Sequence, residues 1–542
     1  MRYLNLFAFL LSACTALGQA PFKVEVRPYS IKNFGGLQSF APAHYKGHWY
    51  MFGGRLDGLH QRQPWASFDA QGHNDQLIVV DKQRDSARYV DLGGLPSPLY
   101  DQLKSTNMEY YQHDSLLYLV GGYGISGATG THRTFSGLVI IDLAALDRYV
   151  FRQMGSLGSC FKRVTGPDFA VTGGSLQYKK GVFYLIGGHR FDGRYNPMNG
   201  PSFTQQYTNA VRKFTLSGPP LNPQVTWLPA LKDAQLLHRR DYNVLPQLDP
   251  QGKLSFTALS GVFKRTADLP YLNAVAIDSS SVKEIPGFRQ YFNHYHAAHL
   301  PIYDTVSGAI HNLIFGGIAQ YYIDQNGHRV QDNNVPFVNT IAAVSRDPQG
   351  NYRETPMEAT MPGLLGAGSV FYKAPGLPAS EDGHIATLSF PLQDTLTLGY
   401  IVGGIRSNAA NIFNQNTGTQ SSATQEVFEV RLLPGRNLGR QEASPIRMHM
   451  VIYPNPAQEK IRLEYEAESH APVEIKIHDQ NGRLVFQYKG ETGPGAQHFL
   501  SIPLQKLPRG TYVISLNQLG KRQIQQFIRA PQAGQGAHHR KR

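Results

Sequence analysis

Short apolar runs that end in two small residues recur along most of the chain. Each run is rich in aromatic and β-branched residues and is closed by glycine, which is typical of a β-strand. The six copies are WYMFGG ending at Gly54, LLYLVGG at Gly122, VFYLIGG at Gly188, FTALSG at Gly261, NLIFGG at Gly317 and LGYIVGG at Gly404. In four of the six copies, a polar residue that opens a second apolar run follows at nearly the same offset. The pattern indicates a repeat.

Each repeat predicts four strands: one before a tight turn, one with the paired small residues, one after the polar marker, and a last β-rich stretch. The sixth repeat has no fourth strand after residues 427–433, whereas the N-terminal segment 22–28 is a strand without a repeat of its own. We therefore expect residues 22–28 to complete the last repeat and close a ring. Ring closure would remove exposed sheet edges.

These double-glycine repeats resemble kelch repeats. The resemblance covers residues 22 to about 433. It implies an all-β fold in which residues 21–433 form a six-bladed kelch-type β-propeller.

The pattern changes after residue 433. Residues 434–449 form a linker rich in Arg, Gly and Pro, and a Pro-Asn-Pro turn at 454–456 then opens a new domain. Alternating strands follow at 460–466, 473–479, 483–489, 498–504 and 511–517. They predict a small, Ig-like antiparallel β-sandwich.

This C-terminal module resembles the type A C-terminal sorting domain of type IX secretion. The residues that carry the resemblance are YPNPA (453–457), DQNGRLV (479–485), PRGTYVISL (508–516) and RQIQQFI (522–528). The resemblance implies a sorting domain at residues 450–530 that the secretion machinery recognises. It also implies a protein that is secreted or held on the outer surface of a Gram-negative bacterium. Residues 531–542 form a polar, basic tail.

Residues 1–20 read as a signal peptide, with Arg2 before an apolar core at 4–11 and small residues after it. The alternative is a lipobox at residues 11–14, which would make the protein a lipoprotein anchored through Cys14. No later apolar run reaches the length of about 18 residues that a membrane helix requires, so no transmembrane segment is expected. If Cys14 is removed, Cys160 is the only thiol, and we expect a buried apolar role for it.

The chain has a formal net charge of +13, which could favour anionic partners. The positive charges are spread along the chain, however, and only residues 538–542 form a basic run. Nucleic-acid binding is therefore not expected. No nucleophile signature, phosphate loop or nucleotide fingerprint is present, so we assign no catalytic residue and expect no cofactor.

Long connections gather on one face of the predicted propeller, and such loops usually form the binding surface. Aromatic rings and arginines suit glycans, because rings stack on sugars and guanidinium groups pair with carboxylates. The candidate ligand-binding residues are Arg55, His60, Glu109, His189, Arg190, Arg240, Asp241, His294, His296 and Tyr321. Asp57 and Asp192 recur after the double glycine, where Asx turns would let them brace the connections.

Two local patterns leave alternatives open. On a strand, His294 and His296 would point to one face like a pair of metal ligands, but no third ligand is evident, so channel histidines are favoured over a metal site. Arg239, Arg240 and Asp241 are either an anion site or a structural ion pair that ties repeats together, and the structural role is favoured.

We expect a non-catalytic module that binds a glycan or protein ligand. The alternative is a carbohydrate-acting enzyme of the epimerase, lyase or oxidase type that uses the central channel. A convergent acid–base pair in the channel would favour the enzyme.

Overall fold

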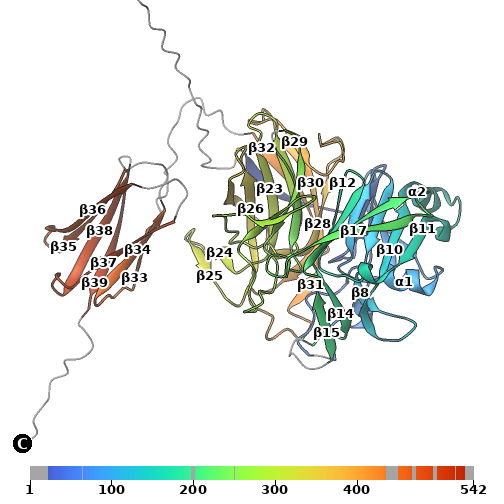
Figure 1. The fold of residues 1–542 in the computed structure, drawn as a ribbon, viewed down its shortest axis with the longest axis horizontal. Helices are drawn as coiled ribbons and strands as arrows, with labels where there is room; N and C mark the ends of the chain where they lie inside the picture. The colour runs from blue at the N-terminus through green and yellow to red at the C-terminus, as the bar shows by residue number, and fades with distance from the viewer. Residues whose placement is uncertain are drawn as a thin grey trace, which may run out of the picture. The chain divides into compact units, whose positions relative to one another are not determined.

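The computed structural model describes residues 22–63, 65–196, 202–249, 251–434, 450–466, 472–491, 497–518 and 521–530. The chain divides into a first unit, Met1–Arg436, and a second unit, Asn437–Arg542 (Figure 1). Strands make up most of the regular structure, which confirms the prediction of an all-β protein. The expected signal peptide, Cys14 and the tail after residue 530 lie outside the described residues, as does nearly all of the expected linker.

The first unit contains six antiparallel meanders of four main strands. The first sheet holds β2 (Ala41–Tyr45), β3 (His48–Phe52), β4 (Gln76–Asp81) and β5 (Ser86–Asp91). The second holds β6 (Glu109–His113), β7 (Leu116–Val120), β10 (Gly137–Asp142) and β11 (Phe161–Thr165). The third holds β12 (Ser175–Lys179), β13 (Val182–Ile186), β16 (Ala210–Ser217) and β17 (Gln224–Lys232).

The remaining three sheets follow the same order along the chain. The fourth holds β18 (Asn243–Leu248), β19 (Leu254–Leu259), β20 (Ala274–Ile277) and β21 (Val282–Glu284). The fifth holds β22 (His299–Asp304), β23 (Ile310–Ile318), β26 (Phe337–Arg346) and β27 (Tyr352–Thr360), with β29 (Ala386–Leu388) parallel to β22. The sixth holds β28 (Leu364–Lys373), β30 (Leu396–Ser407), β32 (Val427–Leu433) and β1 (Lys23–Tyr29), with β31 (Ser421–Ala423) on β30.

The paired small residues sit where one sheet meets the next. The backbone of Gly403 is left-handed, with φ of 71°, and a Cβ there would overlap the carbonyl oxygen of Leu37. Gly404 N donates to the same oxygen at 2.8 Å. Leu37 precedes the first sheet, so the sixth sheet contacts the first. Gly53 and Gly121 approach a carbonyl of the connection that leads into the following sheet, and Gly316 approaches a carbonyl of β28, which explains why glycine occupies these positions.

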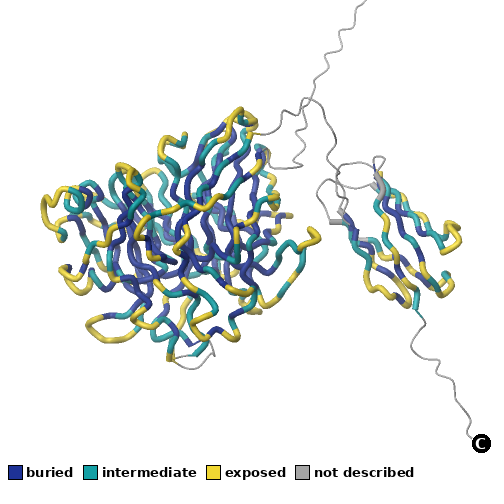
Figure 2. Tube along the Cα trace, turned by 180° about the vertical axis from the view of Figure 1, so that it is seen from behind, coloured by how far each residue is buried: buried dark blue, intermediate teal, exposed yellow. Residues whose placement is uncertain are grey.

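The outer strand of the sixth sheet comes from the other end of the first unit. Strand β1 pairs antiparallel with β32 over seven residues, from Lys23 opposite Leu433 to Tyr29 opposite Val427. Phe22 and Val24 are buried in an apolar cluster with strands of the fifth and sixth sheets. Figure 2 shows that burial of this kind runs through the sheets, whereas exposed residues gather in the connections.

Two long connections form a further sheet that the sequence does not predict. Strands β8 (Tyr123–Ile125) and β9 (His132–Thr134) follow Gly122, and β14 (His189–Gly193) and β15 (Phe203–Tyr207) follow Gly188. They pair in the order β15-β14-β9-β8, with Arg133 opposite Asp192 where the two connections meet. In Figure 1 these strands lie at the lower edge of the first unit.

The other elements of the first unit are short. They are the helices α1 (Ser97–Leu103) and α2 (Leu143–Arg152), the 3₁₀ turns η1 (Ala70–Gly72), η2 (Leu157–Cys160) and η3 (Pro167–Phe169), and the hairpin of β24 (Tyr321–Ile323) and β25 (Arg329–Gln331). Cys160 is buried in an apolar cluster, and burial raises the pKa of its thiol to about 11.

The second unit is a small β-sandwich. One sheet holds β33 (Met450–Tyr453), β34 (Lys460–Glu466) and β37 (Gln497–Pro503); the other holds β36 (Leu484–Glu491), β35 (Pro472–Asp479), β38 (Gly510–Gln518) and β39 (Lys521–Arg529). Ile461, Ile475, Ile514 and Phe527 are fully buried in the core of this unit. Across the described parts of both units, no helix has the length and apolarity needed to span a membrane.

Candidate ligand-binding site

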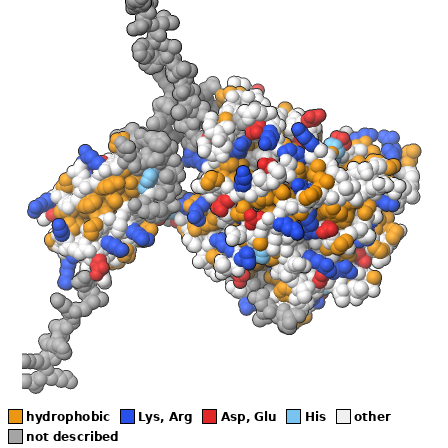
Figure 3. Space-filling view, viewed as in Figure 1, with side chains coloured by type: hydrophobic (Ala, Val, Ile, Leu, Met, Phe, Trp, Pro, Cys, Tyr) orange, Lys and Arg blue, Asp and Glu red, His pale blue; other side chains and the backbone are white. Residues whose placement is uncertain are grey.

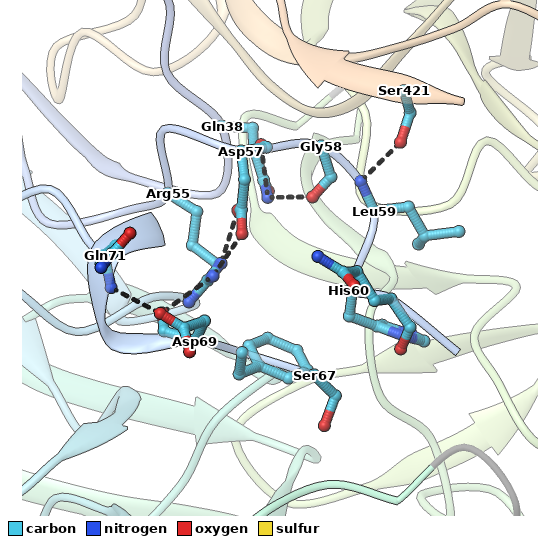
Figure 4. Close-up of polar contacts among 12 residues, drawn as sticks. Gln38, Arg55, Asp57, Gly58, Leu59, His60, Ser67, Asp69, Gln71 and Ser421 are labelled. Carbon is cyan, nitrogen blue, oxygen red and sulfur yellow. Dashed lines mark hydrogen bonds and ion pairs between the residues drawn. The ribbon is translucent and has the colours of Figure 1, made fainter. Parts of the chain in front are cut away.

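Arg55 braces its own connection. Its side chain is 2% exposed, its Nε donates to Asp57 Oδ1 at 2.7 Å, and its Nη2 contacts the second carboxylate oxygen (Figure 4). Nη2 also donates to the carbonyl oxygen of Asp69 at 3.2 Å. The geometry therefore gives Arg55 a structural role. Sequence reasoning grouped it with ligand-binding residues, because burial cannot be read from a loop position.

The same brace recurs in the third repeat. Arg190 Nε donates to Asp192 Oδ2 at 2.6 Å, so each aspartate binds the arginine two residues before it. The sequence predicts Asx turns at these aspartates, but in the structure the brace is an ion pair. Charge pairing across one residue is possible because alternate side chains of an extended strand share a face.

Five polar and aromatic side chains meet beside Arg240, and together the six come from four connections. We call His60, Tyr195, Tyr207, Arg240, Asp241 and Tyr295 the Arg240 cluster. Arg240 Nε donates to Tyr207 Oη at 3.2 Å, and Arg240 Nη1 forms an ion pair with Asp241 Oδ2. Tyr295 Oη donates to the same carboxylate oxygen at 3.2 Å. The ring of His60 packs edge-on against Tyr195, with centroids 4.8 Å apart.

The cluster holds the Arg240–Asp241 ion pair and one neutral imidazole. Burial lowers the pKa of Arg240, but Tyr295 and Asp241 outweigh burial and raise it well above its ordinary value. Burial, together with the neighbouring Arg240 and Arg55, lowers the pKa of His60 to about 4. At neutral pH the cluster therefore presents a cationic guanidinium beside an uncharged ring that can exchange hydrogen bonds.

A small cavity brings together Glu109, Asp241 and His296, which belong to three different parts of the chain. Its volume is about 10 Å³, which is close to the space that one water molecule needs. Glu109 Oε1 accepts from Gly174 N at 2.8 Å. Burial raises the pKa of Glu109 to about 8, and the charge of Asp241 adds to the rise. A protonated carboxyl group thus lies beside a second carboxyl group at neutral pH.

The strand expected at His294 and His296 is wrong. Strand β22 begins only at His299, and both histidines have left-handed backbone, with φ of 50° and 41°. The turn sends them to different places: His294 Nδ1 bonds Gly316 O at 2.8 Å in a buried position, whereas His296 lines the cavity. Among the described residues, no group of three or more His, Cys, Asp or Glu side chains could hold a metal ion.

The other candidates do not belong to the Arg240 cluster. His189 is buried, and its Nδ1 is 2.6 Å from Gln205 Nε2. Tyr321 lies on β24, where its ring meets Tyr291 edge-on. Arg239 is buried and donates to the carbonyl oxygens of Leu236, Ser260 and Asn273, which is a structural role. Arg190 lines a separate groove with Arg133.

Sequence reasoning missed the three tyrosines of the cluster. Tyr195 follows β14 and Tyr207 ends β15, so both belong to the hairpin that the sequence did not predict. Tyr295 lies between the two histidines that the sequence did single out. Its position could have been found by treating residues 293–296 as a turn.

Comparison with known proteins identifies the second unit. Residues 451–529 match the family described as the secretion system C-terminal sorting domain, which confirms the resemblance seen in the sequence. Such a domain implies export to the cell surface or secretion. No curated protein matches the chain.

Several solved structures align with much of the chain at low identity. "Structure of YjhT" has a TM-score of 0.38 and 11% identity, over 73% of this chain and 97% of the other. A fungal alcohol oxidase in complex with copper aligns with a TM-score of 0.36 and 10% identity, over 94% of this chain and 100% of the other. A β-xylosidase/α-arabinofuranosidase from a compost microbial metagenome aligns with a TM-score of 0.33 and 10% identity, over 75% of this chain and 95% of the other. TM-scores below 0.5 do not establish a shared fold or function.

Proposed function

We propose that the chain is an exported, six-bladed kelch-type β-propeller that binds a glycan with an acidic group at the Arg240 cluster. The observation that carries this proposal is the convergence of His60, Tyr195, Tyr207 and Tyr295 on Arg240. The Arg240 side chain is 14% exposed, so it is held in place yet still reaches solvent.

The sheet contacts support the propeller. Six meanders follow one another along the chain. In the first, second and fifth repeats, glycines at equivalent positions contact either the connection that leads into the following sheet or its first strand. The sixth repeat makes the same contact with Leu37, ahead of the first sheet. Strand β1 then supplies the outermost strand of the sixth sheet. A cyclic order of contacts is what a closed ring of blades requires.

The chemistry of the cluster supports a glycan. Tyrosine rings offer flat apolar faces for the C–H face of a sugar, and the Arg240 guanidinium can pair with a carboxylate. Neutral His60 can exchange hydrogen bonds with sugar hydroxyl groups. Figure 3 shows Lys and Arg side chains scattered over the visible surface rather than gathered in one field, which favours a local site over general attraction to polyanions.

The sorting domain supports a site of action outside the cell. We propose that residues 1–20 act as the signal peptide that precedes this route, with a lipid anchor at Cys14 as the alternative. Residues 434–449 and 531–542 are proposed as a linker and a polar, basic tail.

A glycan array probed with the full chain tests the binding function. We expect acidic glycans to bind, and Arg240→Gln to weaken that binding at least tenfold, while Arg353→Gln, an exposed position on β27, leaves it unchanged. Tyr195→Ala removes a stacking surface without touching the ion pair, so it should also weaken binding. Equal binding by Arg240→Gln, Tyr195→Ala and the unaltered chain would show that the ligand site is elsewhere.

A second function, a carbohydrate-acting enzyme, is favoured by one observation. Glu109, Asp241 and His296 line one cavity, and the raised pKa of Glu109 suits a proton donor at neutral pH. Nuclear magnetic resonance of acidic sugars incubated with the protein tests it. Turnover that is abolished by Glu109→Gln would establish an enzyme. Binding without turnover would instead support the binding module.

A further inference from the structure

A groove of about 450 Å³ lies between the sheet of long connections and the second repeat. We call it the Arg133 groove; it is lined by Arg133, Ser136, Thr165, Pro167, Ala170 and Arg190. Arg190 follows His189 on β14, and successive side chains of a strand point to opposite faces. The His189 ring lies 5.7 Å from that of Tyr207 in the Arg240 cluster, so β14 separates the two sites.

Positive charge in the Arg133 groove is incompletely balanced. Arg133 is half-buried, and within the described residues its side chain has no hydrogen bond or ion pair. Arg190 bonds only Asp192 there, through Nε, so both Nη groups remain available. Burial lowers the pKa of Arg163, and the positive charge of the nearby Arg133 lowers it as well. Cations held together in this way are stabilised by an anion.

The rest of the lining favours a sugar-borne anion. Ser136 and Thr165 provide hydroxyl groups, and Pro167 and Ala170 provide apolar surface, but among the described residues no aromatic ring lines the groove to stack on a nucleobase. A volume of about 450 Å³ falls within the range of about 300–1,000 Å³ for small-molecule sites. The sorting domain implies export to the cell surface or secretion, so the groove is accessible to polymers outside the cell.

We infer that the Arg133 groove binds a carboxylate or sulfate group of an acidic polysaccharide. Arg133 and Arg190 pair with the anion, while Pro167 and Ala170 contact the sugar ring. This site is independent of the Arg240 cluster and does not rest on the function proposed for it.

Isothermal titration calorimetry with the full chain tests the inference. The probes are a polyuronate, a sulfated dextran, neutral dextran and duplex DNA, all in the same low-salt buffer. We expect the charged polysaccharides to bind and neutral dextran not to. The double variant Arg133→Gln/Arg190→Gln should weaken binding at least tenfold. The control Lys283→Gln/Arg353→Gln removes the same charge from exposed positions on β21 and β27 and should change the affinity by less than twofold.

The two charged probes identify the anion, because preference for the polyuronate indicates a carboxylate and preference for sulfated dextran indicates a sulfate. Because the Arg240 cluster is also proposed to bind acidic glycans, these titrations are made in the Arg240→Gln background, where the polymers should still bind if the groove is a separate site. Equal weakening by the two double variants, or DNA binding that is as tight and as sensitive to Arg133→Gln/Arg190→Gln, would overturn the inference. Thermal unfolding of each variant identifies any loss of binding that arises from misfolding.

Discussion

At the scale of single residues, buried charged groups show how the first unit is held together. Arg239 is 1% exposed, and its guanidinium donates to three carbonyl oxygens and to the side chain of Asn273, with distances of 2.5–3.0 Å. It also lies over the ring of Tyr271, 4.2 Å from the ring centroid. Removing the guanidinium would leave these carbonyl oxygens without donors.

Arg239→Met should therefore destabilise the first unit by about 2–4 kcal/mol, because methionine fills space but donates no hydrogen bond. Arg353→Met, at an exposed position on β27, should change the stability by less than about 0.5 kcal/mol. Urea denaturation of both variants measures the difference. Equal midpoints would mean that the buried arginine contributes no net stability.

Glu109 predicts a pH dependence of stability. The folded protein keeps its proton up to a pH of about 8, whereas the unfolded chain releases it near 4.5. Below pH 4.5 both states hold the proton, so the group has no effect there. The contribution of Glu109 therefore lowers stability as the pH rises from 4.5 to about 8.

Glu109→Gln should remove this contribution, because the amide oxygen can still accept from Gly174 N. We expect a gain of at least about 1 kcal/mol at pH 7.5 and little change at pH 4.5. Burial also raises the pKa of Glu354 to about 8, so the slope should decrease without disappearing. Thermal unfolding across this pH range tests the prediction, with exposed Glu284→Gln as the control. A gain that is equal at both pH values would contradict it.

The sequence identified the chemistry of the candidate site better than its geometry. His60, Arg240 and Asp241 do meet, because connections from different sheets of the first unit converge there. The pairing of Arg55 with Asp57, only two residues away, was not expected. The strand expected at His294 and His296 was wrong because a left-handed turn replaces it.

At the scale of elements, the repeated glycines set how closely neighbouring sheets approach. Gly403 combines positive φ with contact to the carbonyl oxygen of Leu37. Gly47 has positive φ as well, but a Cβ there would have no neighbour within 4 Å. Substituting Gly47 therefore tests backbone strain alone, whereas substituting Gly403 tests backbone strain together with close packing.

Gly403→Ala should destabilise the first unit by about 2–4 kcal/mol, the sum of backbone strain and overpacking. Gly47→Ala carries the strain alone and should cost about 1 kcal/mol. Unfolding free energies from denaturant titration give both values. Equal effects of the two substitutions would show that contact between the sixth and first sheets does not need glycine.

The elements that the sequence predicts are those with local signals. An apolar run that ends in two small residues indicates the second strand of each of the six meanders, from β3 to β30. The sheet of β8, β9, β14 and β15 was missed because it joins two connections through one pair, Arg133 and Asp192. Pairing between distant loops leaves no periodic pattern in either of them.

At the scale of the whole molecule, the first and last strands of the first unit share one sheet. Strand β1 covers the edge of β32 along its full length, and Phe22 packs on Phe390 with ring centroids 5.0 Å apart. An uncovered edge presents unpaired backbone groups that invite association with other chains.

Removal of residues 1–29 should therefore lower the thermal midpoint of the first unit and promote aggregation. Removal of residues 1–21, which leaves β1 in place, is the matched control and should do neither. Differential scanning calorimetry and size-exclusion chromatography of the two truncated chains measure both effects. If the shorter chain stays monomeric and equally stable, β1 is dispensable for the fold.

The pairing of β1 with β32 also has a consequence for the time course of folding. A strand near the start of the chain must wait for a partner that is synthesised and exported almost a whole unit later. Joining such distant segments carries a large loop-closure entropy and is intrinsically slow. The sixth sheet can reach its final state only when both ends of this unit are available to pair. A first unit that lacks its last strand therefore leaves β1 without a partner.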